Sequence, residues 1–138
     1  MWVFVDTSVF VAALLSDRGA SSYILEHASF VGVKLVTSEY VIEEWHATVL
    51  SKFPSKYSRL LDLLIALDIE VVRTPARPTL LKYQRLMSDA KDVPILAAFI
   101  KSPARYLISL DKDFLRLTLP IKTILTPGDF LMQLRAVS

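Results

Sequence analysis

The chain begins with a short apolar run, Trp2-Val3-Phe4-Val5, that ends on Asp6. Aromatic and β-branched residues make up this run, which predicts a buried β-strand. A carboxylate at the end of a buried strand costs free energy unless it is paired with another group or binds a cation. We therefore expect Asp6 to have partners elsewhere in the chain, and the fold has to bring those partners to the end of this strand.

Short β-rich runs alternate with helical patterns along the whole sequence, which is typical of a parallel sheet covered by helices on both faces. The patterns predict strands over residues 2–5, 33–37, 69–73, 106–109 and 122–125. They predict helices over residues 8–15, 20–29, 39–52, 57–67, 79–87 and 93–101, and a last helix after Thr126. The expected fold is α/β: a three-layer α/β/α sandwich with a central, mostly parallel sheet of four to five strands, related to the Rossmann fold.

Several of these helices carry a start signal. Ser38 and Thr126 are typical N-cap residues, and Asp92 stands where it can cap the helix over residues 93–101. Pro75 and Pro78 indicate a loop before the helix over residues 79–87.

The composition limits the class of protein. With 138 residues, the chain is long enough for one domain, residues 1–138, that buries roughly two-thirds of its unfolded surface. An apolar content of 53% and a mean hydropathy of +0.43 indicate a large core and an apolar subunit interface, so we expect a homodimer. No apolar run reaches the length of about 18 residues that a membrane span needs, and no basic leader marks a signal peptide.

The sequence contains no cysteine, which excludes disulfides and thiolate metal sites and favours a cytoplasmic location. A net charge of +2 and a pI near 8.9 permit a nucleic-acid partner without requiring one. The lysines and arginines are scattered, so their pattern predicts no phosphate-binding face.

Four acidic residues stand near the predicted carboxyl ends of the strands. Asp6 ends the first strand, and Asp111 follows the fourth. In an open parallel sheet, ligands bind beyond the carboxyl ends of the strands, where the strand order reverses. Asp92 lies at the start of the helix that leads into the fourth strand, and Glu44 lies on the helix after the second strand. Both can reach the same end of the sheet.

Helical periodicity separates Glu44 from its neighbour Glu43. Val41, Ile42 and Trp45 belong to the apolar face of this helix. Glu44 lies just outside the edge of that face, and Glu43 lies nearly opposite to it. We therefore expect Glu44 against the body of the protein and Glu43 in solvent.

Carboxylates gathered in one crevice repel one another unless protons or cations intervene. A site with only oxygen ligands, without Cys and without a positioned His, suits one or two Mg²⁺ or Mn²⁺ ions rather than zinc. Sites of this kind hydrolyse phosphodiester bonds by activating a water molecule and by binding the attacking and leaving oxygens. Thr7 and Ser8, directly after Asp6, offer hydroxyls that can hydrogen-bond a phosphate or a carboxylate.

In four sequence blocks the chain resembles the PIN-domain ribonucleases, the VapC-like toxins of bacterial and archaeal toxin–antitoxin pairs. Each block is short, but their order and spacing agree with the family over nearly the whole chain. The matching blocks are Val5-Asp6-Thr7-Ser8-Val9, Ser38 with Ile42-Glu43-Glu44-Trp45, Asp92-Val93-Pro94-Ile95-Leu96-Ala97-Ala98, and Tyr106-Leu107-Ile108-Ser109-Leu110-Asp111-Lys112-Asp113-Phe114.

The resemblance implies a metal site with hydroxyls beside it. Its implied activity is Mg²⁺- or Mn²⁺-dependent cleavage of RNA that leaves 5′-phosphate and 3′-hydroxyl ends. An antitoxin protein and a second copy of the chain are implied as partners. The implied metal ligands are Asp6, Glu44, Asp92 and Asp111, with Asp113 as an additional member, and the implied flanking hydroxyls are those of Ser8 and Ser109.

Structural interpretations compete with metal binding at some of these positions. Asp92 can serve only as a helix N-cap, and Asp113 can cap a short turn. Asp89 is expected in a solvated loop. His27 and His46 lack the spacing of metal ligands and are expected at the surface or half-buried.

The favoured hypothesis is a metal-dependent endoribonuclease, the toxin of a toxin–antitoxin pair. The alternative is a PIN-fold RNA-binding or scaffold subunit with weak or no catalysis, and the intact set of acids argues against it. Phosphotransfer domains fit less well. The haloacid-dehalogenase type needs an acid where this chain has Ser8, and receivers need an aspartate after the third strand, which here ends in Arg73-Thr74-Pro75.

Overall fold

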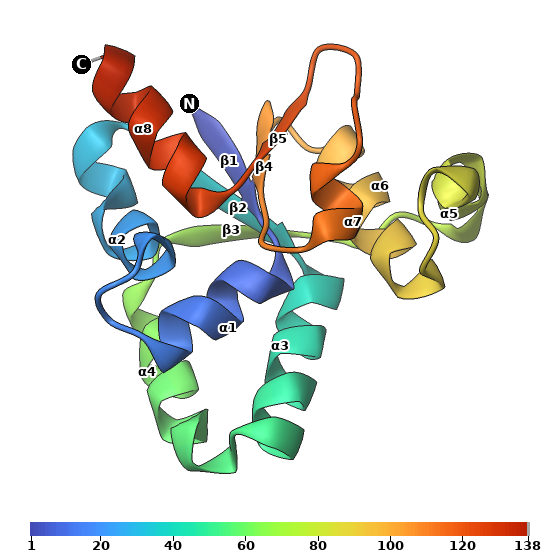
Figure 1. Ribbon diagram of the computed structural model, residues 1–138. Coiled ribbons are helices and arrows are strands. Elements are labelled where there is room, and N and C mark those ends of the chain that lie inside the picture. The colour runs from blue at the N-terminus through green and yellow to red at the C-terminus, as the bar shows by residue number, and fades with distance from the viewer. Residues whose placement is uncertain (138) are drawn as a thin grey trace.

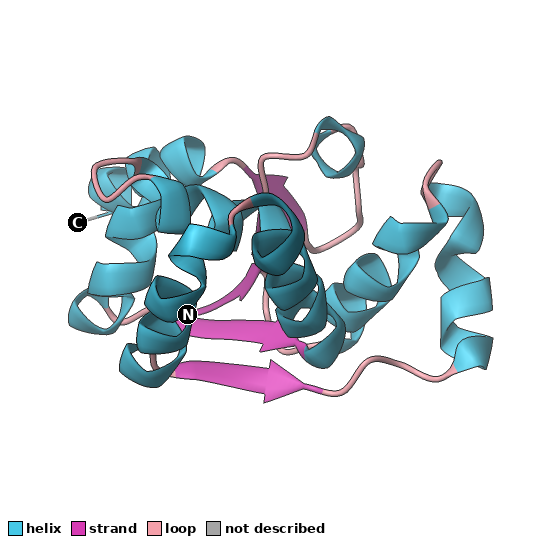
Figure 2. Ribbon diagram, turned by 90° about the horizontal axis from the view of Figure 1, so that it is seen from below, coloured by secondary structure: helices cyan, strands magenta, loops and turns pink. Residues whose placement is uncertain are grey.

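Five parallel strands form one sheet in the computed structural model, which describes residues 1–137. Every neighbouring pair is parallel, and the two arrows seen most clearly in Figure 2 point the same way. The expected α/β fold is confirmed, and each strand ends within one residue of its predicted bounds. The strands are β1 (Trp2–Val5), β2 (Lys34–Ser38), β3 (Ile69–Val72), β4 (Tyr106–Ile108) and β5 (Thr123–Leu125), in the order β3-β2-β1-β4-β5 (Figure 1).

Helices and 3-10 turns occupy the connections between the strands. No helix in the described part of the chain is long and apolar enough to cross a membrane. The α-helices are α1 (Thr7–Leu15), α2 (Ala20–His27), α3 (Glu39–Lys52), α4 (Tyr57–Ala66), α5 (Arg77–Tyr83), α6 (Val93–Lys101), α7 (Lys112–Leu115) and α8 (Pro127–Val137). The 3-10 turns are η1 (Ala28–Val31), η2 (Pro54–Lys56), η3 (Gln84–Leu86) and η4 (Ala90–Asp92).

Both faces of the central strand β1 are covered by helices. Phe4 packs against Phe99 of α6, with ring centroids 5.9 Å apart. Val3 points to the opposite face and lies in register with Tyr106 of β4. Tyr106 in turn packs against Phe130 of α8, with centroids 5.8 Å apart. The sheet therefore has α6 on one face and α8 on the other, as expected for a three-layer sandwich.

The strand order reverses beside β1. The chain passes outward from β1 through β2 to β3 and then returns to form β4 on the other side of β1. The ends of β1 and β4 consequently lie side by side, and the N–H of Asp6 donates to the carbonyl of Ile108 at 3.2 Å. The residues that follow these two strands share one edge of the sheet, where an open parallel sheet binds its ligands.

A buried tryptophan joins α1 to α3. The Trp45 ring is fully buried and stacks on Phe10, with centroids 4.7 Å apart and an interplanar angle of 25°. Its indole N–H has no hydrogen-bond partner among residues 1–137, so this side chain is held by packing alone. Because Glu44 precedes Trp45 on the same helix, this packing determines the direction in which Glu44 points.

Lys122 attaches the start of β5 to the end of α6. Its ammonium donates hydrogen bonds to the carbonyl oxygens of Phe99, Ser102 and Ala104, at 3.0, 2.9 and 2.6 Å. These carbonyls lie at or just beyond the carboxyl end of α6, where a helix leaves its carbonyl groups unpaired. One side chain therefore satisfies several backbone acceptors at once.

The helix starts agree only partly with the sequence prediction. Ser38 and Thr126 accept backbone N–H groups from the first turns of α3 and α8, as predicted. However, α1 begins at Thr7 and not at residue 8, because the Asp6 carboxylate accepts the Thr7 N–H and acts as the N-cap. Pro78 lies in the first turn of α5 and not in a loop, since a proline there has no helical N–H bond to lose. The end of the same predicted helix is the 3-10 turn η3.

Ile121 has a left-handed backbone conformation, with φ of 72°, although it is β-branched. This conformation costs an L-residue about 1–2 kcal/mol, and asparagine tolerates it better. The Ile121 side chain is 87% exposed, so its replacement removes little packing. We expect Ile121→Asn to raise the free energy of unfolding by about 1 kcal/mol, measured by urea denaturation.

Ile65 in α4 provides the matched control, because it is 86% exposed and its φ is negative. Ile65→Asn is expected to give no gain in stability. An equal gain at both positions would mean that the loss of an exposed apolar side chain, and not the relief of strain, explains the effect.

Candidate functional site

Asp6 is buried at the junction of β1 and α1, with 3% of its surface exposed. One carboxylate oxygen accepts the N–H of Thr7, and the other accepts the hydroxyls of Ser8 and Ser109, each at 2.7 Å. Burial raises the pKa of the Asp6 carboxyl, and these donors, with Ser109 first, oppose that rise. The nearby charge of Asp111 raises the pKa further. Hydrogen bonds thus offset part of the cost of burying this charge.

The hydroxyls of Ser8 and Ser109 also hold the segment that follows β4. The N–H of Leu110 donates to Ser8 Oγ, and the N–H of Asp111 donates to Ser109 Oγ, both at 3.0 Å. Each hydroxyl therefore accepts from this segment while it donates to Asp6. The two serines connect residues that are more than a hundred positions apart and fix Asp111 relative to Asp6.

Glu44 has a half-buried carboxylate that accepts the hydroxyl of Thr7. Burial raises the pKa of the Glu44 carboxyl, the Thr7 hydrogen bond opposes the rise, and the charge of Asp6 adds to it. Glu43 is exposed, as helical periodicity predicted. Thr7 therefore orients Glu44 in the way that the two serines orient Asp6.

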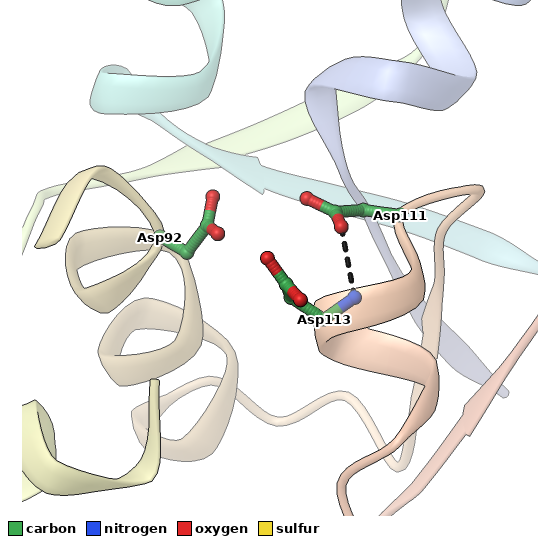
Figure 3. A group of neighbouring side chains, drawn as sticks. All are labelled: Asp92, Asp111 and Asp113. Carbon is green, nitrogen blue, oxygen red and sulfur yellow. Dashed lines mark hydrogen bonds between the residues drawn. The ribbon is translucent and has the colours of Figure 1, made fainter. Parts of the chain in front are cut away.

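Three further carboxylates converge next to these groups: those of Asp92, Asp111 and Asp113, which point toward one another (Figure 3). Each offers one oxygen, and the three oxygens all lie within 4.8 Å of one another. Asp92 comes from the end of η4, whereas Asp111 and Asp113 belong to the start of α7. A set of carboxylate oxygens fits the ligand preference of Mg²⁺ or Mn²⁺ and not that of zinc.

One cleft of about 480 Å³ opens at this end of the sheet. Asp113 is not among its lining residues, but its carboxylate lies close to those of Asp92 and Asp111, which do line the cleft. All five acids of the predicted site, and the three predicted hydroxyls, therefore lie at one end of the sheet. The lining includes Asp6, Thr7, Ser8, Glu44, Asp92 and Asp111.

The two capping interpretations of the acids are wrong. Asp92 occupies the N-cap position of α6, but its side chain makes no capping hydrogen bond. Asp89 caps the preceding turn η4 instead, accepting the N–H of Lys91 at 3.0 Å. Asp111 and not Asp113 caps α7, accepting the N–H of Asp113 at 2.9 Å. Helix capping therefore does not account for the acids at positions 92 and 113.

Sequence reasoning missed two charged residues of the cleft, Asp89 and Lys91. Asp89 is exposed, as expected for a solvated loop, but it also lines the cleft. Lys91 is the one cation in that lining among residues 1–137. The sequence could have pointed to these two residues only through their position just before Asp92. A polar loop before a helix is too common, however, to indicate a site. His27 and His46 are half-buried, as expected, and neither is among the residues that line the cleft.

The charged form of Asp92 is disfavoured near neutral pH. Burial, as the largest cause, and the charges of the surrounding acids together raise the pKa of its carboxyl to about 7. A cation among the carboxylates would reverse this effect, because it stabilises the charged forms. The cluster is therefore electrostatically unfavourable on its own and suited to a divalent ion. The contributing acids, in order, are Asp111, Asp89, Asp6 and Glu44.

The raised pKa of Asp92 makes the stability of the metal-free protein depend on pH. The folded-state pKa of about 7 exceeds the ordinary value of 3.8, so the folded chain binds the proton more tightly than the unfolded chain. Stability is then lost as the pH rises through this range. We expect a lower free energy of unfolding in EDTA at pH 8 than at pH 5.5, and a smaller difference in Asp92→Asn, measured by urea denaturation.

Asp17→Asn, in an exposed turn outside the cluster, serves as the control and is expected to keep the full pH difference. Mn²⁺ should show the opposite dependence, with calorimetric affinity falling below pH 7 because the proton must leave. An Asp92→Asn protein with the unchanged pH difference would contradict the assignment of the shift to Asp92.

Ser109 is buried and bridges Asp6 to the backbone of Asp111. Ser109→Ala removes a donor from a buried carboxylate and the acceptor of a backbone N–H. We expect the free energy of unfolding to fall by about 1–3 kcal/mol. Ser51→Ala, at an exposed hydroxyl near the end of α3, is expected to change it by less than about 0.5 kcal/mol. Equal effects at the two serines would show that the bridge has no special role.

Known proteins similar to this chain were found at the level of family and of fold. A profile of the family described as PIN domain matches residues 2–113. No curated protein matches the sequence.

Two solved structures have the same fold. The crystal structure of VapBC2 from Rickettsia felis bound to a DNA fragment from their promoter aligns with a TM-score of 0.65 at 21% identity, covering 90% of this chain and 97% of that chain. The crystal structure of PAE2754 from Pyrobaculum aerophilum aligns with a TM-score of 0.70 at 17% identity, covering 99% of this chain and 90% of that chain. At these identities the likeness shows the fold.

Proposed function

Since this chain belongs to the PIN domain family, whose members are generally nucleases, we propose that it is an endoribonuclease that uses Mg²⁺ or Mn²⁺ to hydrolyse RNA phosphodiester bonds. The observation that carries the proposal is the convergence of Asp92, Asp111 and Asp113 within 4.8 Å beside a cleft that Asp6 and Glu44 also line. So many carboxylates in one place are costly without a cation, and RNA is itself an anion. A divalent ion offsets the charge of the carboxylates and also attracts the negatively charged RNA.

We assign the binding of one or two ions to these five acids. Asp92, Asp111 and Asp113 have oxygens close enough to share one ion, and Asp6 and Glu44 face the same cleft. When bound, such an ion stabilises charge on phosphoryl oxygens and lowers the pKa of a water molecule.

The hydroxyls of the site hold the acids in place before the substrate arrives. Ser8 and Ser109 orient Asp6, and Thr7 orients Glu44, through hydrogen bonds to their carboxylates. Groups positioned in advance need no reorganisation during the reaction. Attack of water on the phosphorus, with breakage of the P–O3′ bond and transfer of a proton to the leaving O3′, would leave 5′-phosphate and 3′-hydroxyl ends, as in the ribonucleases that the chain resembles.

We also propose that the protein is the toxin of a toxin–antitoxin pair and forms a homodimer. The likeness to VapBC2 supports an antitoxin partner. Exposed apolar side chains supply surface for a protein partner or for a second copy of the chain. The most exposed of these include Phe30, Ile65 and Met132.

Two adjacent glutamates provide a matched test of the activity. Glu44→Gln is expected to reduce Mn²⁺-dependent cleavage of a single-stranded RNA by about a hundredfold or more, because it removes an acid of the cleft. Asp111→Asn should have a similar effect. Glu43→Gln changes the neighbouring exposed residue and should leave the cleavage rate unchanged.

Cleavage is measured by gel electrophoresis of labelled RNA, with EDTA as the metal-free reference. Equal activity in Glu44→Gln and Glu43→Gln would sink the site assignment. A wild-type protein that binds RNA but cleaves none with either metal would favour the alternative function, an RNA-binding or scaffold subunit.

A further inference from the structure

We propose that Lys91 binds a phosphate of the RNA substrate at the rim of the acidic cleft. This inference rests on the proposed function for the choice of ligand. Of residues 1–137, twelve line the cleft; five of these are acids and one, Lys91, is a cation. Among the described residues that line the cleft, Lys91 is the group whose charge attracts a polyanion, and a bound metal ion would be a second such group.

The backbone at Lys91 is held in place on both sides. Its N–H donates to the Asp89 carboxylate at 3.0 Å, and the N–H of Asp92 donates to the Asp89 carbonyl at 3.1 Å. The turn η4 continues directly into α6, whose residues Val93 and Ile95 are buried in the core. The side chain of Lys91 therefore extends from a fixed point next to the metal-binding acid Asp92.

The ammonium of Lys91 lies near the acids but forms no ion pair with any of the described residues. Its charge acts on Glu44: burial, first, raises the pKa of that carboxyl, and Lys91 is among the groups that lower it. Within residues 1–137, Lys91 forms no ion pair at 4.0 Å or less. Its side chain is exposed. A cation in this position can bind an incoming phosphate without first breaking a salt bridge.

Other cations near the acids are less suited to this role. Arg116 already pairs with Asp113, with 3.6 Å between the guanidinium nitrogen and the carboxylate oxygen. Lys112 is exposed on α7 and is not among the residues that line the cleft. Lys91 is the lysine or arginine that both lines the cleft and lacks an ion pair among the described residues.

The test compares Lys91→Gln with Lys91→Arg and with Lys101→Gln, an exposed lysine at the last residue of α6. Binding of a fluorescent single-stranded RNA is measured by anisotropy with Ca²⁺, which also takes oxygen ligands, at increasing KCl concentrations. Lys91→Gln is expected to weaken binding about tenfold, the effect of one charge-assisted hydrogen bond. It is also expected to reduce the slope of log affinity against log salt by about 0.7, the value for one phosphate contact on a single strand.

Lys91→Arg is expected to keep the wild-type salt slope, because a phosphate accepts either cation, and Lys101→Gln is expected to bind as the wild type does. The proposal is overturned if Lys91→Gln binds like the wild type, if both glutamine variants lose affinity equally, or if the arginine variant behaves like Lys91→Gln. A wild-type protein that binds no RNA also overturns it. Cleavage with Mn²⁺ is assayed separately, so a protein with the Lys91-dependent binding but no cleavage would lose the ribonuclease proposal and keep the phosphate contact.

Discussion

The buried carboxylate of Asp6 accepts two hydroxyls, one from the helix after β1 and one from the segment after β4. The same hydroxyls of Ser8 and Ser109 accept backbone N–H groups of Leu110 and Asp111. These hydrogen bonds of Ser8 and Ser109 stabilise a buried charge, join two neighbouring strand ends and position the carboxylate of Asp111. Burying a carboxylate without hydrogen-bond donors costs several kcal/mol of folding free energy. The hydroxyls of Ser8 and Ser109 therefore offset part of the cost of burying Asp6. The remaining acids of the cleft are arranged around this junction.

The gathering of these acids lowers the stability of the protein when no cation is bound. Asp92, Asp111 and Asp113 lie within 4.8 Å of one another, and Asp6, Glu44 and Asp89 add to the negative charge. Burial and these neighbours raise the pKa of Asp92 to about 7, which means that the charged form is disfavoured in the metal-free protein. The hydroxyls of Ser8, Ser109 and Thr7 lower the pKa values of Asp6 and Glu44, but both values are still raised. In the function proposed above, a divalent cation among the acids and Lys91 at the rim would together allow a crevice of this charge to receive an anionic polymer.

Local patterns were sufficient for most of the fold. Alternating β-rich and helical runs predicted every strand, because β-branched and aromatic residues favour strands even in β3 and β5, which have no fully buried residue. Helical periodicity separated the half-buried Glu44 from the exposed Glu43, because only the position of the apolar face was required. Capping was less predictable: the acids at positions 92 and 113 have suitable sequence positions, but Asp89 and Asp111 make the bonds. Which of two nearby carboxylates caps a turn depends on backbone dihedral angles that a residue pattern does not specify.

The sequence by itself determined the class of fold, the residue types of the site and the hard-oxygen chemistry that they favour. These features follow from periodicity and from side-chain chemistry, which are properties of short segments. Only the tertiary structure decided which acids share a cation-sized space, that Ser8 and Ser109 bridge β1 to β4, and that Lys91 lines the cleft. These features depend on the order of strands in the sheet and on distances between residues far apart in the chain. Such distances are set by packing of the whole core, so no single segment of the sequence contains them.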